Sequence, residues 1–175
     1  MKTAHTFLIV FGLLMAAGSV SAQISILAGL GFSFGTTAEA VGIHIRGDVD
    51  LDDSPYGGSL NFISYFSPAT GPDNVDGVKA VYRETNLNGH YFFISEEDLS
   101  VYGLAGLNIS TAGAKLTINL PFTPNIKETE TQVGLNLGGG ARFPVADNIL
   151  VVGEVKYILS KFDQLVISAA GVYRF

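Results

Sequence analysis

Residues 41–51, VGIHIRGDVDL, form the most regular stretch of the chain, because apolar or small residues alternate there with polar or small ones. Successive side chains of a β-strand point to opposite faces of a sheet. A period of two therefore predicts a strand with one apolar face and one charged face. The apolar face would carry Val41, Ile43, Ile45, Gly47, Val49 and Leu51, and the other face Gly42, His44, Arg46, Asp48 and Asp50.

The same period recurs in seven more segments of the chain, and none of them shows a sustained helical period. We expect strands at 24–34, 58–66, 83–94, 100–110, 131–143, 149–159 and 165–175. After residue 22, no run reaches the roughly 18 apolar residues that a membrane-spanning helix needs. The sequence therefore predicts an all-β fold of eight strands.

The first 22 residues have the features of a secretory signal peptide. Lys2 supplies a positive charge, residues 7–17 are an uncharged apolar run, and residues 20–22 fit the small-residue cleavage pattern. The apolar run is too short for a membrane anchor, which takes about 20 helical residues. We expect residues 1–22 to be removed, which leaves 23–175 as a single barrel domain.

The composition excludes several classes of protein. The chain is 47% hydrophobic and 15% charged, with 21 Gly and no Cys. Such a chain is too apolar to be intrinsically disordered, and it lacks the thiols of disulfide scaffolds and thiolate metal sites. Its net charge of −6 argues against a nucleic-acid partner. An apolar chain without a spanning helix needs another way to place its hydrophobic surface.

The connections between the expected strands alternate in length. Those at 52–56, 95–99 and 144–148 are short, whereas those at 67–82 and 111–130 are long. Outer-membrane β-barrels alternate short periplasmic turns with longer extracellular loops in this way. With strands running alternately up and down, the aromatic residues fall into two girdles: Phe93, Phe143, Tyr173 and Phe175 in one, and Phe32, Phe34, Phe66 and Tyr157 in the other. The pattern predicts an eight-stranded antiparallel up-and-down transmembrane β-barrel.

The polar face of each strand would then point into the barrel. The expected interior polar network consists of His44, Arg46, Asp48, Asp50, Glu84, His90, Arg142, Glu154, Lys156 and Arg174. Four of these side chains are cationic and four are acidic. An eight-stranded barrel is just wide enough for its side chains to fill it, and buried charges need partners. We expect a plugged interior and no conducting pore.

The last quarter of the chain resembles a known family. Residues 132–175 contain a Gly-rich strand, a short Pro/Asp/Asn turn, a strand of alternating acidic and basic inward residues, and an aromatic carboxyl end. They resemble the last three strands of the OmpA/OmpX-type family of small bacterial outer-membrane β-barrel proteins, although this chain has no Trp. The resemblance implies location in the bacterial cell outer membrane, contact with outer-membrane lipids, and insertion by the barrel-assembly machinery. In that family the machinery recognises the final strand, and Tyr173 and Phe175 match its signal.

No motif in the sequence predicts a cofactor or a metal site. Asp48, Asp50, Asp52 and Asp53 mimic the start of a calcium loop. An EF-hand needs Gly at the sixth position and Glu at the twelfth, where this chain has Asp53 and Ser59. We interpret the cluster as a solvated turn beside two inward carboxylates.

His44 and His90 leave an enzymatic alternative open. This fold class includes lipid A deacylases, and acyl hydrolysis can use a His together with a Ser and an acid. No local motif pairs either His with a Ser. We therefore interpret both as members of the interior network, and a lipid-modifying acyl hydrolase stays an alternative function.

The two long connections, 67–82 and 111–130, are the candidate sites for an extracellular partner. The alternation resumes within 115–120, so we interpret 115–130 as a hairpin that continues two strands beyond the membrane. Exposed strand edges can pair with a strand of another protein. A solvated loop without a partner, or a ninth strand at 115–120, are the alternatives.

The expected function is a structural or surface-interaction role, resembling adhesion, in the outer membrane. A small passive pore and a secreted lipocalin-like carrier of an apolar ligand are further alternatives beside the hydrolase. The carrier needs apolar residues inside and polar residues outside. The orientation of the two strand faces therefore separates it from a membrane barrel.

Overall fold

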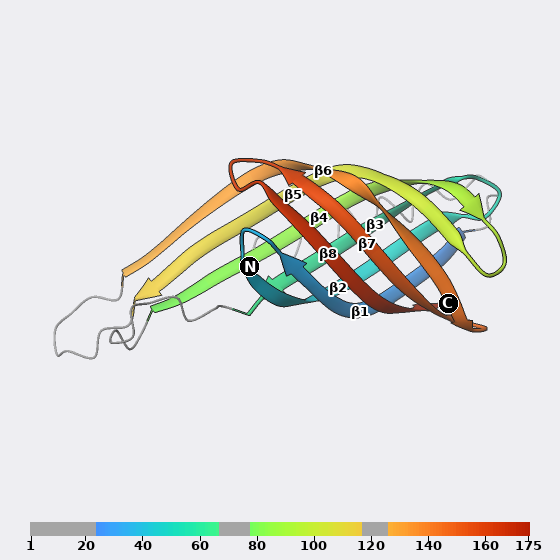
Figure 1. The fold of residues 1–175 in the computed structure, drawn as a ribbon, viewed down its shortest axis with the longest axis horizontal. Coiled ribbons are helices and arrows are strands. Elements are labelled where there is room, and N and C mark those ends of the chain that lie inside the picture. Colours follow the sequence, from blue (N-terminus) through green and yellow to red (C-terminus); the bar gives the residue numbers. More distant parts are fainter. Residues whose placement is uncertain (1–23, 67–77, 117–125) are drawn as a thin grey trace.

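A computed structural model of the chain describes residues 24–66, 78–116 and 126–175, which form a closed antiparallel barrel (Figure 1). Its strands are β1 (Ile24–Gly35), β2 (Ala40–Leu51), β3 (Tyr56–Tyr65), β4 (Val78–Ser95), β5 (Ser100–Leu116), β6 (Ile126–Ala146), β7 (Ile149–Leu159) and β8 (Gln164–Arg174). Each strand pairs with its neighbours in the sequence, and β1 closes the barrel against β8. The predicted fold class and number of strands are confirmed. The expected signal peptide at 1–22 lies outside the described residues, and none of those described forms a helix able to cross a membrane.

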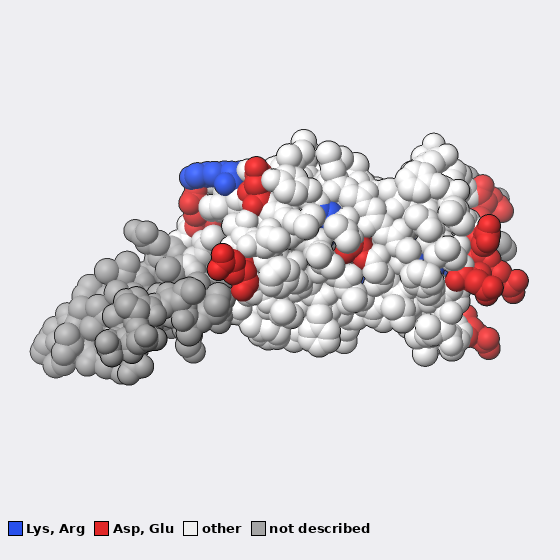
Figure 2. Space-filling model, in the orientation of Figure 1, with Lys and Arg blue, Asp and Glu red and all other residues white. Residues whose placement is uncertain are grey.

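The alternation in the sequence becomes the two faces of the barrel wall. In β2, Ile45 is 56% exposed on the outside, whereas its neighbour Arg46 is 2% exposed on the inside. The other strands follow the same inside-out pattern, with large apolar side chains exposed and polar side chains buried. Figure 2 shows the result on one face of the molecule, where a mostly uncharged band separates charged residues near the two ends. This arrangement is the reverse of what a soluble carrier of an apolar ligand needs.

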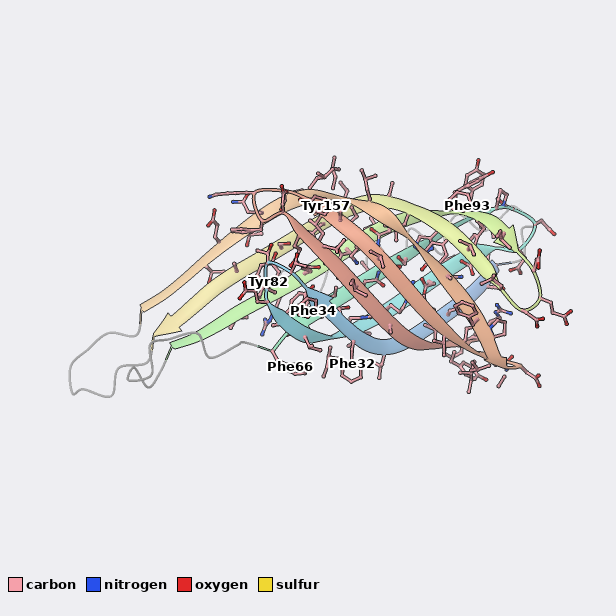
Figure 3. The ribbon with its side chains drawn as sticks, in the orientation of Figure 1. Phe32, Phe34, Phe66, Tyr82, Phe93 and Tyr157 are labelled. Carbon is pink, nitrogen blue, oxygen red and sulfur yellow. The ribbon has the colours of Figure 1, made fainter. Side chains whose placement is uncertain are left out.

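The connections define two different ends of the barrel. The connections at 52–55, 96–99 and 147–148 all lie at one end, which we name the short-turn end. The two longer connections leave from the opposite end, which we name the long-connection end. Exposed aromatic side chains lie toward both ends of the barrel (Figure 3). Phe93 lies toward the short-turn end, and Phe32, Phe66 and Tyr157 lie toward the long-connection end.

Strands β4, β5 and β6 are longer than the sequence predicted, and they protrude together at the long-connection end (Figure 1). Residues 78–82, expected in a loop, belong to β4 because they pair with 112–116 of β5. The predicted continuation of β5 and β6 is confirmed as far as the pair Leu116–Ile126, while 117–125 lies outside the described residues. Residues 115 and 116 continue β5, so they do not begin a ninth strand.

Candidate functional site

A cluster of ion pairs occupies the middle of the barrel interior. Arg46 and Asp48 lie two residues apart on β2, so they share its inward face. The Arg46 guanidinium donates two hydrogen bonds to the Asp48 carboxylate, with Nη2–Oδ1 and Nε–Oδ2 distances of 2.6 and 2.9 Å. Across the barrel, Glu154 of β7 lies 3.5 Å from Arg46 Nη1 and 3.5 Å from Lys156 Nζ. All four side chains are buried, so the charges are compensated within the barrel.

Arg142 of β6 extends this cluster toward the short-turn end. Its guanidinium forms ion pairs with Asp50 and, at 3.3 Å, with Asp48. The same group lies 5.0 Å from the ring centre of Phe92 and 5.3 Å from that of Tyr102, within the range of cation–π attraction. Arg142 therefore connects β6 with β2 across the interior, where the two strands are not neighbours.

Tyr102 of β5 is an interior residue that the sequence reasoning missed. Its hydroxyl donates to Glu154 Oε2 at 3.0 Å, and its ring stacks on His90 with 4.4 Å between centres. Gly140, its register partner on β6, provides the space, because a Cβ there would lie 2.5 Å from the Tyr102 hydroxyl oxygen. Side chains alternate along a strand, so residues separated by an even number of positions share a face. Tyr102 lies six positions before the inward Asn108, and this spacing was the signal that could have identified it.

Both interior histidines have a serine partner. The Ser33 hydroxyl lies 2.8 Å from His44 Nδ1, and the Ser59 hydroxyl lies 3.0 Å from His90 Nε2. The sequence showed no such pairs because each Ser lies on a different strand from its His. All four residues are buried, and no carboxylate among the described residues forms a hydrogen bond with either imidazole. The arrangement thus has neither the acid of a hydrolytic triad nor a serine open to the surroundings.

Glu84 of β4 is satisfied in a different way from the other inward carboxylates. Its oxygens accept hydrogen bonds from the Tyr65 hydroxyl at 3.2 Å, the Asn86 amide at 3.4 Å, and the Gln164 amide. No Lys or Arg among the described residues forms an ion pair with it, so its partners are neutral donors. Gln164, which the sequence reasoning also missed, supplies one of the neutral donors.

An amide network lies between Glu84 and the ion pairs. Asn108 donates to Asn86 Oδ1 at 2.8 Å, and Asn136 donates to Asn88 Oδ1 at 2.7 Å. These side chains come from β4, β5 and β6, the three strands that also protrude. The network therefore ties their inward faces together where they enter the barrel.

Apolar side chains fill the interior beside the polar groups. Toward the short-turn end, one cluster consists of Leu27, Leu150, Val152, Ala170 and Val172. Toward the long-connection end, a second consists of Ala40, Ile63, Tyr65, Ile158 and Val166. Between them, the space lined by His44, Asn61 and Lys156 does not admit a sphere the size of a water molecule.

Arg174 is the one expected network member that the barrel does not bury. It is exposed at the last position of β8, where the strand reaches the rim, so the prediction of its burial is wrong. Tyr173 and Phe175 on either side point outward, with their rings 5.0 Å apart in an edge-to-face contact. The remaining nine predicted members lie inside the barrel, with Asp50 slightly open to solvent.

The aspartates near the β2–β3 turn already have partners. Asp48 and Asp50 pair with arginines, and Asp52 accepts a hydrogen bond of 2.6 Å from the Ser25 hydroxyl. Within the part of the chain that the structure describes, no group of three or more His, Cys, Asp or Glu side chains could hold a metal ion.

The protruding part of β4, β5 and β6 is the second candidate site. Strand β6 pairs with β5 from Ile126 onward but with β7 only from Leu135 onward, so one side of residues 126–134 lacks a partner strand among those described. Lys161, in the β7–β8 turn, reaches this edge and donates to Glu130 at 2.7 Å. This hydrogen bond, with a second from Gln132, holds the pKa of Glu130 below its ordinary value.

Solved structures share this fold, although neither a family model nor a curated protein matches the chain. The barrel is similar to a major outer membrane protein of Thermus thermophilus, with a TM-score of 0.66 and 12% identity over 87% of this chain and all of that one. It is similar to Ail, the attachment invasion locus protein of Yersinia pestis, with a TM-score of 0.59 and 17% identity over 89% of this chain and 100% of that one. It is also similar to the N-terminal barrel domain of Pseudomonas aeruginosa OprF, with a TM-score of 0.56 and 15% identity over 88% of this chain and 98% of that one. The fold is that of small outer-membrane β-barrels.

Proposed function

We propose that the chain is an integral protein of the bacterial outer membrane, with a closed interior and a surface-interaction role at its long-connection end. Support for the location comes from the exposed apolar band between two charged ends. Lipid favours such a band, since charged side chains on the outer face of a barrel are costly at the membrane centre. The structural neighbours named above are outer-membrane proteins, which agrees with this location.

The location can be tested by fractionation of cells that express the full chain. We expect the protein in the outer-membrane pellet, with a change of gel migration when the folded barrel is heated. Recovery from the periplasm without detergent would contradict the proposal.

Closure of the interior is supported by the crossing ion pairs. Arg46 contacts Glu154, and Arg142 contacts Asp50, so charged side chains join opposite walls of the barrel. An interior of this width leaves little space once its side chains fill it. We expect no steady conductance in a planar bilayer; a large and lasting conductance would indicate a pore.

The observation that carries the surface role is the unpartnered edge of β6. An extended segment of another protein can add to such an edge through main-chain hydrogen bonds. Proteins usually protect long exposed edges, because such edges promote unwanted pairing. Among the described residues the edge of 126–134 has no partner strand, and the β7–β8 turn approaches it only at single side chains, Lys161 at Glu130 and Ser160 at Gly134. One structural neighbour carries attachment in its name, which agrees with a role of this kind.

The surface role can be tested by shortening the protruding sheet. Residues 112–116 pair with 126–130, so both segments can be removed together without a change in the register of the barrel. Bacteria displaying the shortened variant should adhere less to a cultured cell layer than those displaying the full chain. Equal adherence, with equal amounts of heat-modifiable barrel, would contradict a role for the edge.

A further inference from the structure

Three lysines occupy one row across the protruding sheet. Lys79 of β4 is the register partner of Lys115 in β5, and Lys115 is the register partner of Lys127 in β6. Residues directly opposite each other on antiparallel strands have Cβ atoms about 5 Å apart, and like charges in that position are destabilising. A row of three lysines therefore favours an anion that lies close to all of them.

The lysine row belongs to a face of the sheet that carries only positive charge. Lys79, Arg83, Lys115 and Lys127 all occupy odd positions, whereas the three glutamates of these strands, Glu84, Glu128 and Glu130, occupy even positions. The chain carries a net charge of −6 and has nine Lys and Arg residues after residue 22. Four of these nine cations therefore belong to this one face. We name these four residues the basic face.

The basic face continues the apolar outside of the barrel. On the same odd positions, Leu87, Leu107 and Leu135 form a row of register partners that are 58, 52 and 54% exposed. On β4, Arg83 is exposed and lies four residues from Leu87 toward the long-connection end. Lys79 lies another four residues in the same direction, which is about 13 Å at a rise of about 3.3 Å per residue. The positive charges thus begin where the apolar band ends.

We propose that the basic face binds the phosphate groups of anionic lipid headgroups in the membrane around the barrel. The proposal depends on the membrane location proposed above. Lysine and arginine at the edge of an apolar surface keep their stems on that surface while their charged ends reach the headgroups. Phosphates at this level would offset the mutual repulsion of the lysine row.

The test measures which lipids surround the full-length barrel in a bilayer. The protein is reconstituted in phosphatidylcholine with spin-labelled phosphatidylglycerol or spin-labelled phosphatidylcholine, and electron paramagnetic resonance gives the fraction of each label that the protein immobilises. One basic residue near an anionic surface changes association about fivefold. We expect a several-fold preference for phosphatidylglycerol that is strongly reduced in the combined variant Lys79→Gln, Lys115→Gln and Lys127→Gln, in which Arg83 remains.

Two controls separate charge from structure. Replacement of the same three lysines by arginine should keep the preference, and Lys161→Gln, which removes a cation outside the basic face, should leave it unchanged. Heat-modifiable migration reports that each variant is folded. A preference that is equal in the wild type and in the glutamine variant would overturn the proposal.

A further measurement identifies the source of the phosphate. Excess inorganic phosphate should affect the preference no more than chloride of the same ionic strength. A specific loss with phosphate would mean a site for soluble anions and would also overturn the lipid assignment. If neither spin label is immobilised, the membrane location itself is wrong, and this result is distinct from immobilisation without a preference.

Discussion

The two halves of the barrel interior satisfy buried carboxylates in different ways. Toward the short-turn end, Asp48, Asp50 and Glu154 contact guanidinium or ammonium groups. Toward the long-connection end, Glu84 is surrounded by hydroxyl and amide donors. Removing a cation from the first half leaves a buried charge without compensation, whereas Glu84 in the second half has no ion pair to break. The two halves should therefore respond differently to substitutions of similar size.

The largest effect is expected for Arg46→Ala, which removes the cation between Asp48 and Glu154. Breaking a buried pair by removing one partner costs about 3–5 kcal/mol. The free energy of unfolding can be measured by urea titration in detergent micelles, with circular dichroism as the signal. Arg174→Ala, at the exposed rim, is the matched control and should change stability by less than about 0.5 kcal/mol. Equal losses for the two variants would show that the interior ion pairs do not stabilise the barrel.

An intermediate effect is expected for Gly140→Ala in the ion-paired half. The added Cβ would lie 2.5 Å from the Tyr102 hydroxyl oxygen and 2.8 Å from the Gly153 carbonyl oxygen. Overpacking of this kind costs about 1–3 kcal/mol. Gly171→Ala is the control, because a Cβ there meets no atom within 4 Å. A neutral Gly140→Ala would mean that Tyr102 can move without loss of its hydrogen bond to Glu154.

A smaller effect is expected for Glu84→Gln in the amide half. Its present partners are neutral donors, so the substitution alters hydrogen bonds but breaks no ion pair, at a cost of about 1 kcal/mol. Glu154→Gln should cost more under the same conditions, because it removes the carboxylate that faces Arg46 and Lys156. The order of these two variants tests the difference between the halves, and a reversed order would contradict it.

The smallest effect is expected outside the barrel, at the exposed pair of Glu130 and Lys161. The hydrogen bond from Lys161 lowers the pKa of Glu130, so its stabilising effect is present above the ordinary carboxyl pKa and is lost as the pH falls through the lowered value. Carbon-detected nuclear magnetic resonance can follow this titration. In Lys161→Gln the pKa of Glu130 should rise toward its ordinary value; an unchanged pKa would mean that the ion pair does not persist in solution.

Strand order and strand faces could be predicted from the sequence because both depend on local patterns. The period of two assigned His44, Arg46 and Asp48 to the inside, and short connections required neighbouring strands to pair. The prediction failed at Arg174, which follows the inward period but lies at the rim. It also failed at residues 78–82, because their pairing with β5 depends on a strand that is distant in the sequence.

The sequence by itself determined that the chain has eight strands, each with an apolar face and a face carrying small or polar side chains. That information is contained in the alternation of neighbouring residues, as in 41–51. Only the tertiary structure decided which inward side chains meet, such as Arg142 with Asp50, and that three lysines occupy register-paired positions across the protruding sheet. These contacts depend on the register between strands and on closure of the barrel, which bring together residues far apart in the chain.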